Sequence, residues 1–430
     1  MISTVAESAT DADRAAWAQR LRRVRAASEA LAADLSPEDQ TIQSMPDVSP
    51  TKWHLAHTTW FFETFLLIPL LPGWRVHHPA YGHLFNSYYE AVGPRHPRPQ
   101  RGLLSRPGVG EIASYRRAIT GGMLDLIGGA DERQWREIAP LIELGLNHEE
   151  QHQELILMDI KHVFSVNPLK PAYRPRAATP APRSMAGPAG WMQFGGGMAE
   201  IGHAGNGFAF DNEGPRHRQW LEPFRLASRP VTCGDYLDFI EDGGYRRPEF
   251  WLSDGWATVQ SQGWQAPLYW EREPDGEWSI FTLGGLLPLD PAEPVCHASF
   301  YEADAFARWA GARLPTEAEW EVAAADVPLA GNLGDRGRFH PEAVSGNGNE
   351  LRQMIGDIWE WTASSYSPYR GFHAVNGAIG EYNGKFMSGQ MVLRGGAAVT
   401  PPGHVRVTYR NFFPPAARWA FSGIRLAEDA

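Results

Sequence analysis

Cysteine, long apolar runs and excess basic charge are all scarce in this sequence. The two cysteines, Cys233 and Cys296, stand far apart among 430 residues and form no CxxC motif, so neither a disulfide scaffold nor a thiolate metal site is indicated. The longest apolar run, residues 65–71, contains Pro69 and is too short to span a bilayer. A net charge of −11 argues against a nucleic-acid partner. We therefore expect a cytoplasmic protein that is not inserted in a membrane.

The residues that are abundant indicate a folded protein of two domains. Hydrophobic residues make up 43% of the chain, which excludes a disordered polypeptide, and 430 residues suit two domains of ordinary size. The first residues, MISTVAESATDADRAAW, have neither a basic start nor an apolar stretch, so we expect no signal peptide. The 17 tryptophans favour either rigid loop packing or an aromatic pocket for a cationic or heteroaromatic ligand.

Helical patterns fill the first third of the chain. The signals are apolar residues at helical spacing, long stretches of good helix formers, and a Ser-Pro pair typical of a helix start. Together they predict a four-helix bundle over residues 1–163. The predicted helices are residues 12–34, a helix starting at Ser49-Pro50, residues 110–127 and residues 131–163.

A proline-rich segment follows the bundle. Residues 164–190 contain six prolines and little apolar periodicity, which predicts an extended linker. From residue 191 to 430, short apolar stretches alternate with Gly, Asn, Asp and Pro turns, and helices are predicted at 301–311 and 316–325. We expect an irregular α+β domain there.

The strongest local motif is Asn-His-Glu-Glu-Gln-His-Gln-Glu at residues 147–154. His148 and His152 are four positions apart in a predicted helix, so their imidazoles project from the same face, one turn apart. Two imidazoles in this arrangement form half of a metal site. The alternative is a pair of exposed histidines on a polar face.

The same segment also matches HExxH, the helix motif of zinc proteases. In that chemistry Glu149 would be the general base and a downstream residue would be the third ligand. The sequence just downstream offers only His162 before the proline-rich segment. The helix that starts at Ser49-Pro50 offers His54 and His57 instead, and a histidine from a second helix can complete such a pair in a bundle.

Three neutral imidazoles on one side of a metal leave the opposite positions open for substrate and oxygen, a variant of the open non-haem iron site. Of the two upstream histidines we favour His57 as the ligand, and we expect His54 to support a ligand or to lie on the surface. The loop that follows carries Tyr88 and Tyr89, which could donate a proton beside a metal.

Two arginines in the same loop, Arg98 and Arg101, could clamp a carboxylate with fork geometry. The alternative to a carboxylate clamp is a loop that packs through its aromatic residues, with both arginines exposed to solvent.

The motifs SPTKWHLAH, LFNSYYEAVGPRHPRPQRGLLSRP and NHEEQHQE resemble the sulfoxide synthases of ergothioneine biosynthesis, which are hercynine-dependent non-haem iron enzymes. The later motifs RLPTEAEWE, GDIWEWT, RGG and SGIRL resemble formylglycine-generating enzymes. The resemblance spans nearly the whole chain. It implies a DinB-like four-helix bundle that carries Fe(II), followed by a C-type-lectin-like domain that forms a wall of the substrate pocket.

The resemblance also implies roles for individual residues. The implied iron ligands are His57, His148 and His152, and Tyr88 and Tyr89 match an active-site tyrosine pair. Gln151, Asn411 and Phe412 match residues that contact hercynine, which is trimethylhistidine. The implied donor site consists of Arg98 and Arg101 for a carboxylate and Asp47 for an amine. Substrates would be hercynine, O2 and either cysteine or a selenosugar.

Two departures from the family pattern bear on the donor. Relatives commonly have FMCNQMVLRGGSC, whereas this chain has Ser388-Gly389 in place of Cys-Asn and Ala397-Ala398 in place of Ser-Cys. Smaller residues would make room for a bulkier donor, as in the sister group of selenoneine synthases, which use a selenosugar. We therefore favour a selenoneine-type product over an ergothioneine-type product.

Two other function classes remain open on the sequence. One is a zinc hydrolase built on residues 148–152, and the other is a binding protein without catalysis. The chain has no cysteine after Cys296, so the second domain lacks the C-terminal cysteine pair with which formylglycine-generating enzymes work.

Overall fold

The computed structural model describes residues 11–176, 187, 189–205, 207–343 and 350–430. The chain divides into two compact units, each described by itself below. The first unit comprises Met1–Leu169 together with Gly205–Asp211 and His373–Asn383, and the second comprises the remaining segments. The polar residues 1–10, and residues 177–186 and 188 of the predicted linker, lie outside the described residues.

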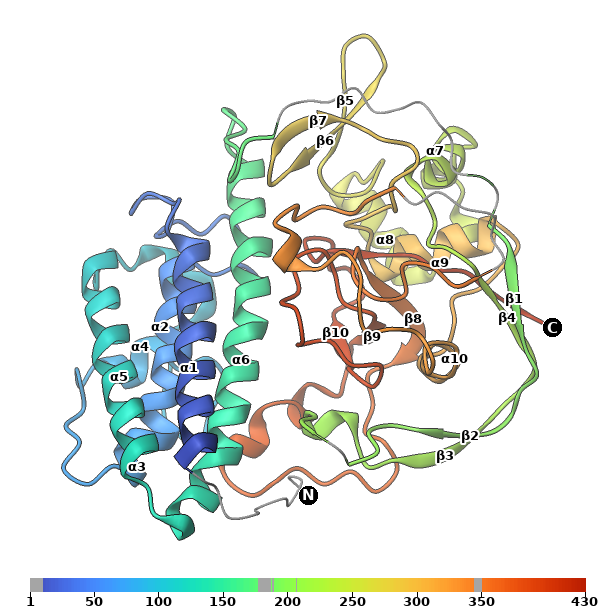
Figure 1. Cartoon of the computed structure of the whole chain (residues 1–430). Helices are drawn as coiled ribbons and strands as arrows, with labels where there is room; N and C mark the ends of the chain where they lie inside the picture. The colour runs from blue at the N-terminus through green and yellow to red at the C-terminus, as the bar shows by residue number, and fades with distance from the viewer. Residues whose placement is uncertain (1–10, 177–186, 188, 206, 344–349) are drawn as a thin grey trace. The chain divides into compact units, whose positions relative to one another are not determined.

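Four long helices lie side by side in the first unit, as the helical patterns predict (Figure 1). The second of them continues through a π-helical turn, Glu63–Leu67, into the short α3, Ile68–Leu70. The loop that follows contains α4, Tyr81–Phe85, and a 3-10 turn, Arg98–Leu103. The four long helices are α1, Asp11–Ala32; α2, Thr51–Phe62; α5, Val109–Gly129; and α6, Glu132–Ser165.

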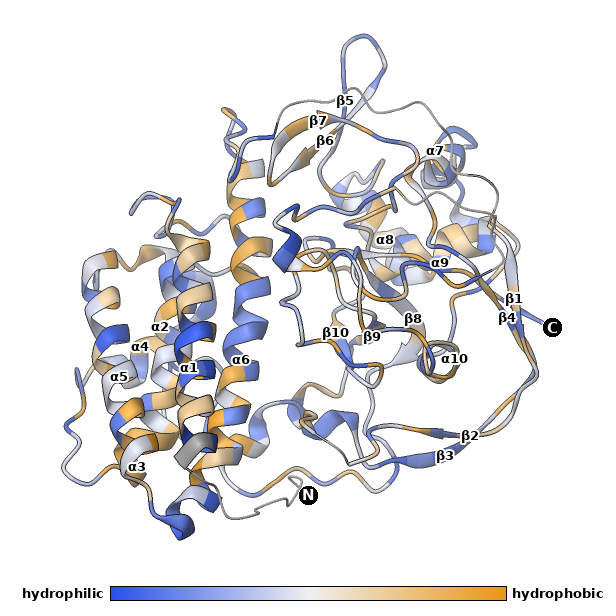
Figure 2. Cartoon of the chain, viewed as in Figure 1, coloured by the Kyte–Doolittle hydropathy of each residue, from blue (hydrophilic) through white to orange (hydrophobic). Residues whose placement is uncertain are grey.

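Helix ends and burial follow from local sequence. Asp131 caps α6 by accepting a hydrogen bond from the Gln134 amide at 2.8 Å. The predicted Ser-Pro start is shifted by one residue, because Pro50 occupies the cap position of α2 and Thr51 is the first helical residue. Every residue of α2 is buried although the helix contains histidines, threonines and a lysine. Figure 2 likewise shows hydrophilic stretches along α6. A polar site inside the bundle is the expected consequence.

The second unit is built from short strands in four small sheets. The largest sheet has the order β10-β9-β8-β11, and the others are β1-β4-β12, β5-β6-β7 and the ribbon β2-β3. The strands are β1, Trp191–Phe194; β2, Gly197–Ile201; β3, His217–Leu221; β4, Phe224–Ala227; β5, Trp270–Arg272; β6, Trp278–Thr282; β7, Gly285–Pro288; β8, Trp359–Ser365; β9, Met391–Arg394; β10, Asn411–Phe413; β11, Ser422–Gly423; and β12, Ala427–Asp429.

The helices of this unit are partly as predicted. The two predicted ones form as α9, Phe300–Trp309, and α10, Glu317–Ala323, each with a Ser or Thr cap that bonds the third helical amide. Two further helices, α7, Cys233–Glu241, and α8, Ser253–Gln262, were not predicted. One core cluster gathers around Trp320 of α10 with Phe224 and Leu226 of β4, all 0% exposed.

Charged groups also lie inside the second unit. Arg425 and Glu360 are both fully buried and pair at 2.7 Å, and Glu360 also accepts a hydrogen bond from the Trp320 indole at 2.7 Å. The indole hydrogen bond links α10 to β8, and Arg425 supplies the counter-charge that the buried carboxylate needs. None of the helices in the described residues is both long and apolar enough to cross a membrane.

Candidate metal centre

The three predicted iron ligands lie together in the helical unit. His57 comes from α2, and His148 and His152 come from adjacent turns of α6. One ring nitrogen from each can be chosen so that the three atoms lie within 4.8 Å of one another. Their exposed fractions are 0%, 2% and 8%. In the described part of the chain this is the one cluster of metal-ligating side chains with such spacing.

Burial keeps these imidazoles neutral. It lowers the pKa of His148 to about 3, and it lowers the pKa of His57 and His152 well below the ordinary value, with the neighbouring imidazoles and the Arg101 charge adding to the effect on the last two. A neutral imidazole has a lone pair on one nitrogen, which is what a metal requires. Three neutral nitrogens in one buried place therefore fit a divalent transition metal.

Hydrogen bonds already select the free nitrogen of His57. Its Nδ1 lies 2.6 Å from the Phe85 carbonyl oxygen, which can only accept, so Nδ1 carries the hydrogen and Nε2 the lone pair. His57 Nε2 and both ring nitrogens of His148 are buried, and no described residue forms a hydrogen bond with them. Buried unsatisfied nitrogens are costly unless a ligand completes them.

A stack of flat side chains flanks the His57 ring. Trp53 lies parallel to it at 4.7 Å, and Trp60 lies nearly parallel at 5.5 Å. The Arg101 guanidinium lies over the Trp53 ring, 3.3 Å from the ring centre. The stack joins the metal-binding residues to one of the predicted donor-binding arginines.

His54 does not lie on the surface. It is 3% exposed, and its Nδ1 is 2.8 Å from His152 Nδ1 while its Nε2 is 2.9 Å from Asp159 Oδ2. It therefore contacts a predicted ligand, which was one of its two expected roles. Asp159, two turns after His152 on α6, was not singled out from the sequence, because nothing in its spacing marks it.

Glu149 turns away from the histidines and into an ion-pair network. Its two carboxylate oxygens bind Arg25 at 3.1 Å and Arg116 at 2.7 Å, and the side chain is fully buried. A zinc hydrolase would need this carboxylate to take a proton from water. Both oxygens are engaged, so the geometry argues against that alternative. The His162 ring nitrogen lies 2.7 Å from the Ser44 hydroxyl, and His162 is not part of the metal-ligating cluster.

The two loop tyrosines, Tyr88 and Tyr89, stack on each other beside α2. Their ring centres are 4.6 Å apart, and Tyr89 packs 5.6 Å from Trp60. Asn86 holds this loop by exchanging hydrogen bonds with the Tyr89 backbone at 3.0 and 3.1 Å. Burial raises the pKa of both phenols, so each keeps its hydroxyl proton at neutral pH.

A third tyrosine, Tyr382, was missed by the sequence analysis. Its hydroxyl donates a hydrogen bond to Gln151 Oε1, and its ring centre lies 5.5 Å from that of His148 and 6.3 Å from that of Tyr88. Tyr382 and Gln151 are 231 positions apart in the chain, so no local pattern connects them.

The predicted donor-site residues gather at one end of α2. Buried Arg101 donates to the Ser49 hydroxyl at 2.9 Å, and Arg98 donates to the Asp47 backbone carbonyl. Burial lowers the pKa of Arg101, and the nearby charge of Arg98 lowers it further. The arginines and Asp47 are thus brought together, although Asp47 meets Arg98 through its backbone rather than through its carboxylate.

The residues predicted to wall the hercynine site belong to the second unit. Asn411 and Phe412 lie on the edge strand β10, where the Phe412 ring stacks on Tyr366 at 4.0 Å. Ser388 and Gly389 are exposed, whereas Ala397 and Ala398 are fully buried in their unit. The role of these residues in substrate binding stays a prediction.

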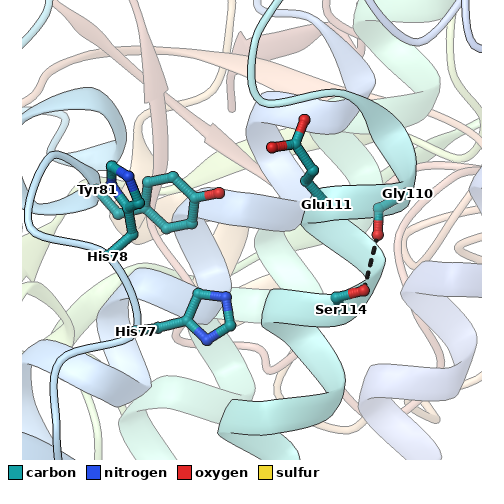
Figure 3. A pocket seen from close by; sticks show the side chains of 6 residues that line it. All are labelled: His77, His78, Tyr81, Gly110, Glu111 and Ser114. Carbon is teal, nitrogen blue, oxygen red and sulfur yellow. Dashed lines mark hydrogen bonds between the residues drawn. The ribbon is translucent and has the colours of Figure 1, made fainter.

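An open cleft on the helical unit contains further titratable groups (Figure 3). In that view His77 and Tyr81 extend toward α5, which carries Glu111 and Ser114, and the Ser114 hydroxyl bonds the Gly110 carbonyl at 3.0 Å. Among the described residues these side chains form no metal-ligating group. The buried histidines remain the stronger candidate site.

Comparisons with known proteins identify one family in each half of the chain. Residues 20–156 match the DinB superfamily, and residues 172–343 and 335–430 match the sulfatase-modifying factor enzyme 1-like domain. A hercynine oxygenase of Mycolicibacterium smegmatis is 33% identical, and the match covers 90% of this chain and 92% of that protein. The chain belongs to the hercynine oxygenase family. It is therefore an enzyme of an oxygenase family, and the predicted two-part fold and family resemblance are confirmed.

Other relatives fit the same assignment. A hercynine oxygenase of Mycobacterium tuberculosis is 32% identical over 95% of this chain and 97% of its own length. Ergothioneine biosynthesis protein 1 of Schizosaccharomyces pombe is 30% identical over 52% of this chain and 28% of its own length.

Proposed function

We propose that this protein is an Fe(II)- and O2-dependent enzyme that forms a carbon–selenium or carbon–sulfur bond at C2 of the hercynine imidazole. The observation that carries the proposal is the buried cluster of His57, His148 and His152, in which one ring nitrogen from each lies within 4.8 Å of the others and nitrogens of His57 and His148 are unsatisfied. The names of the relatives supply the substrate, because they are called hercynine oxygenases.

Fe(II) held by these three histidines would supply the redox chemistry that O2 requires, with coordination positions left open for substrates. The protein supplies the proton. The Tyr382 ring lies 5.5 Å from the His148 ring and 6.3 Å from the Tyr88 ring, which stacks on Tyr89. Burial raises the pKa of Tyr88 and Tyr89, so their hydroxyls stay protonated. A neutral phenol is able to donate its proton as the new bond forms.

Hercynine carries a fixed quaternary ammonium group, a carboxylate and an imidazole. Aromatic faces suit the ammonium group, and an amide suits the imidazole. Gln151 is suited to the imidazole contact, since its Oε1 is fixed by Tyr382 and its position on α6 is adjacent to His152. Asn411 and Phe412 are our candidates for the remaining contacts.

The favoured donor is a selenosugar, and the product would then be of the selenoneine type. Ala397 and Ala398 support this choice, because their side chains are smaller than the Ser-Cys pair common in the family and both are fully buried. The pair Ser388-Gly389 is weaker support for a selenosugar donor than Ala397-Ala398. Gly389 has φ +67°, a left-handed conformation that suits glycine or asparagine, so backbone geometry alone accounts for either residue there.

Cysteine is the second candidate donor. Arg98 and Arg101 gather near Ser49 and form a cationic group that suits a carboxylate, which cysteine has and a neutral sugar lacks. With cysteine the product would be of the ergothioneine sulfoxide type.

Metal loading and donor competition test the two parts of the proposal separately. Anaerobically loaded protein should hold one Fe(II), and His57→Ala, His148→Ala and His152→Ala should each lose most of it, while His83→Ala, a change on the exposed loop, should keep it. Full iron retention in the three ligand variants would overturn the metal assignment.

The loaded enzyme is then given hercynine and O2 with equal concentrations of cysteine and 1-seleno-glucose. We expect the selenium product to dominate and the quadruple variant Ser388→Cys, Gly389→Asn, Ala397→Ser, Ala398→Cys to shift the ratio toward sulfur. A higher kcat/KM for cysteine in the unaltered protein would assign it to the ergothioneine type.

A further inference from the structure

The side chains of Asp159, His54 and His152 form one continuous hydrogen-bonded chain that ends at the metal-binding cluster. Asp159 Oδ2 lies 2.9 Å from His54 Nε2, and His54 Nδ1 lies 2.8 Å from His152 Nδ1. All three side chains are buried, with residue exposures of 3%, 3% and 8%. Among the described residues, neither Nδ1 atom has a second hydrogen-bond partner.

Proton positions along this chain follow from what each atom is able to do. Asp159 Oδ2 accepts a hydrogen bond from the Ser49 amide at 2.7 Å, so this oxygen is an acceptor and the hydrogen between it and His54 belongs to Nε2. In its neutral form His54 then has its lone pair on Nδ1, and the hydrogen between the two Nδ1 atoms comes from His152.

His152 is thereby left with its lone pair on Nε2, away from His54. We propose that Asp159 and His54 are positioning residues that fix the Nε2 lone pair of His152 for the metal. The inference rests on the proposed function, because it assumes that the cluster binds Fe(II). It adds two residues to the machinery, and it explains why both histidines of the WHLAH motif are buried although only His57 belongs to the cluster.

The two metal-binding helices are coupled by the same contacts. Asp159 and His152 belong to α6, while His54 belongs to α2 and Ser49 lies just before it. The carboxylate therefore restrains both the tautomer of His152 and the approach of α2 to α6. The Nδ1 of His57 is restrained separately, by the Phe85 carbonyl. In both His57 and His152, Nδ1 is therefore hydrogen-bonded and Nε2 has no partner among the described residues. Partners of this kind typically change metal affinity about 10–100-fold when removed.

Fe(II) affinity, measured anaerobically by competition with a chelator, tests the proposal. We expect Asp159→Ala and His54→Phe to weaken Fe(II) binding about 10–100-fold. Asp159→Asn should have a smaller effect, because its amide oxygen is still able to accept from His54 and Ser49. The control is His162→Ala on the same helix, which removes a half-buried histidine outside the cluster and should leave the affinity within about twofold of the unaltered protein.

A second measurement reads the imidazole tautomers directly and needs no metal. In histidine-selectively 15N-labelled, metal-free protein, the imidazole nitrogen shifts should identify His152 as the Nδ1–H tautomer and His54 as the Nε2–H tautomer, with assignments taken from single-histidine variants. The opposite tautomers, or Asp159→Ala and His54→Phe variants that bind Fe(II) as tightly as the unaltered protein, would overturn the inference. Failure of the unaltered protein to bind Fe(II) would instead overturn the proposed function.

Discussion

Glu149 and His148 are neighbours in the sequence and have opposite surroundings in the structure. Successive residues of a helix point about 100° apart, so one side chain reaches the histidine cluster and the other reaches Arg25 and Arg116. The HExxH pattern specifies only the spacing of the two histidines and a glutamate directly after the first. Whether the glutamate serves catalysis depends on its partners, and two arginines from α1 and α5 occupy it here.

Removal of the Glu149 carboxylate should therefore damage stability in the first place. Glu149→Ala leaves two guanidinium groups buried without their counter-charge, and such a change costs about 3–5 kcal/mol. We expect that loss in the free energy of unfolding by urea, measured on the metal-free protein so that iron binding does not contribute.

The matched control is Glu137→Ala, an exposed glutamate on the same helix, which should change stability by less than about 0.5 kcal/mol. Equal stability of Glu149→Ala and the unaltered protein would show that the buried network contributes little.

At the scale of elements, the distance between α2 and α6 determines whether His57 meets the other two histidines. Gly145 lies on α6 one turn before His148, at a point where α2 approaches closely. A Cβ atom at this position would lie 2.6 Å from Phe62 Cε1 and 3.0 Å from Phe61 Cε1. The glycine thus permits a helix approach that no larger residue would allow.

Gly145→Ala provides a test of this approach. Helix propensity alone would make alanine more stable by about 1 kcal/mol, but the contact with the rigid phenyl rings forces α2 and α6 apart and costs about 1–3 kcal/mol. We expect a net loss of stability on thermal unfolding, together with weaker Fe(II) binding. Gly128→Ala on α5, where a Cβ meets nothing within 4 Å, is the control and should stabilise the protein.

Most of the bundle was predictable, because its helices have long, strongly patterned sequences. His148 and His152 of the candidate metal centre were predictable for the same reason, since i and i+4 spacing on one helix is a local signal. His57 lies on another helix, and the choice of it over His54 relied on the family resemblance. Asp159 and Tyr382 were not predictable. Asp159 acts through a histidine on another helix, and α7 and α8 were missed because short helices within a loop-rich domain carry weak periodicity.

For the whole molecule, the order of the sequence and the order in space differ at two places. Gly205–Asp211 and His373–Asn383 lie within the second half of the sequence, which the sequence analysis assigned to the C-terminal domain, yet they cluster with the helical unit. They also contact each other there, since the Phe210 ring stacks on Tyr382 at 5.5 Å and Asn383 donates to Asp211 at 2.6 Å. Long-range pairing of this kind leaves no periodic signal in one sequence.

The segment His373–Asn383 also reaches the loop that carries the paired tyrosines. The Glu381 carboxylate accepts hydrogen bonds from the backbone amides of Glu90 at 3.0 Å and Ala91 at 2.9 Å, directly after Tyr88 and Tyr89. A carboxylate that binds two adjacent amides holds the loop firmly, because each charge-assisted bond is worth about 1.5–3 kcal/mol. Glu381 therefore restrains where the tyrosine hydroxyls lie, although it is about 290 positions away in the chain.

Glu381→Ala should release this loop and leave the metal site intact. We expect hydrogen exchange at the Glu90 and Ala91 amides to become about tenfold faster or more, which corresponds to the loss of one such bond. The His77 amide, which bonds Glu63 at 2.8 Å, is the internal control and should exchange at its original rate. Fe(II) content should stay constant while product formation slows, because the phenols of Tyr88 and Tyr89 lose their fixed place. Unchanged exchange at both amides would mean that the loop is held by Asn86 alone, and Tyr88 and Tyr89 would then be positioned entirely by residues within the first 169 positions of the chain.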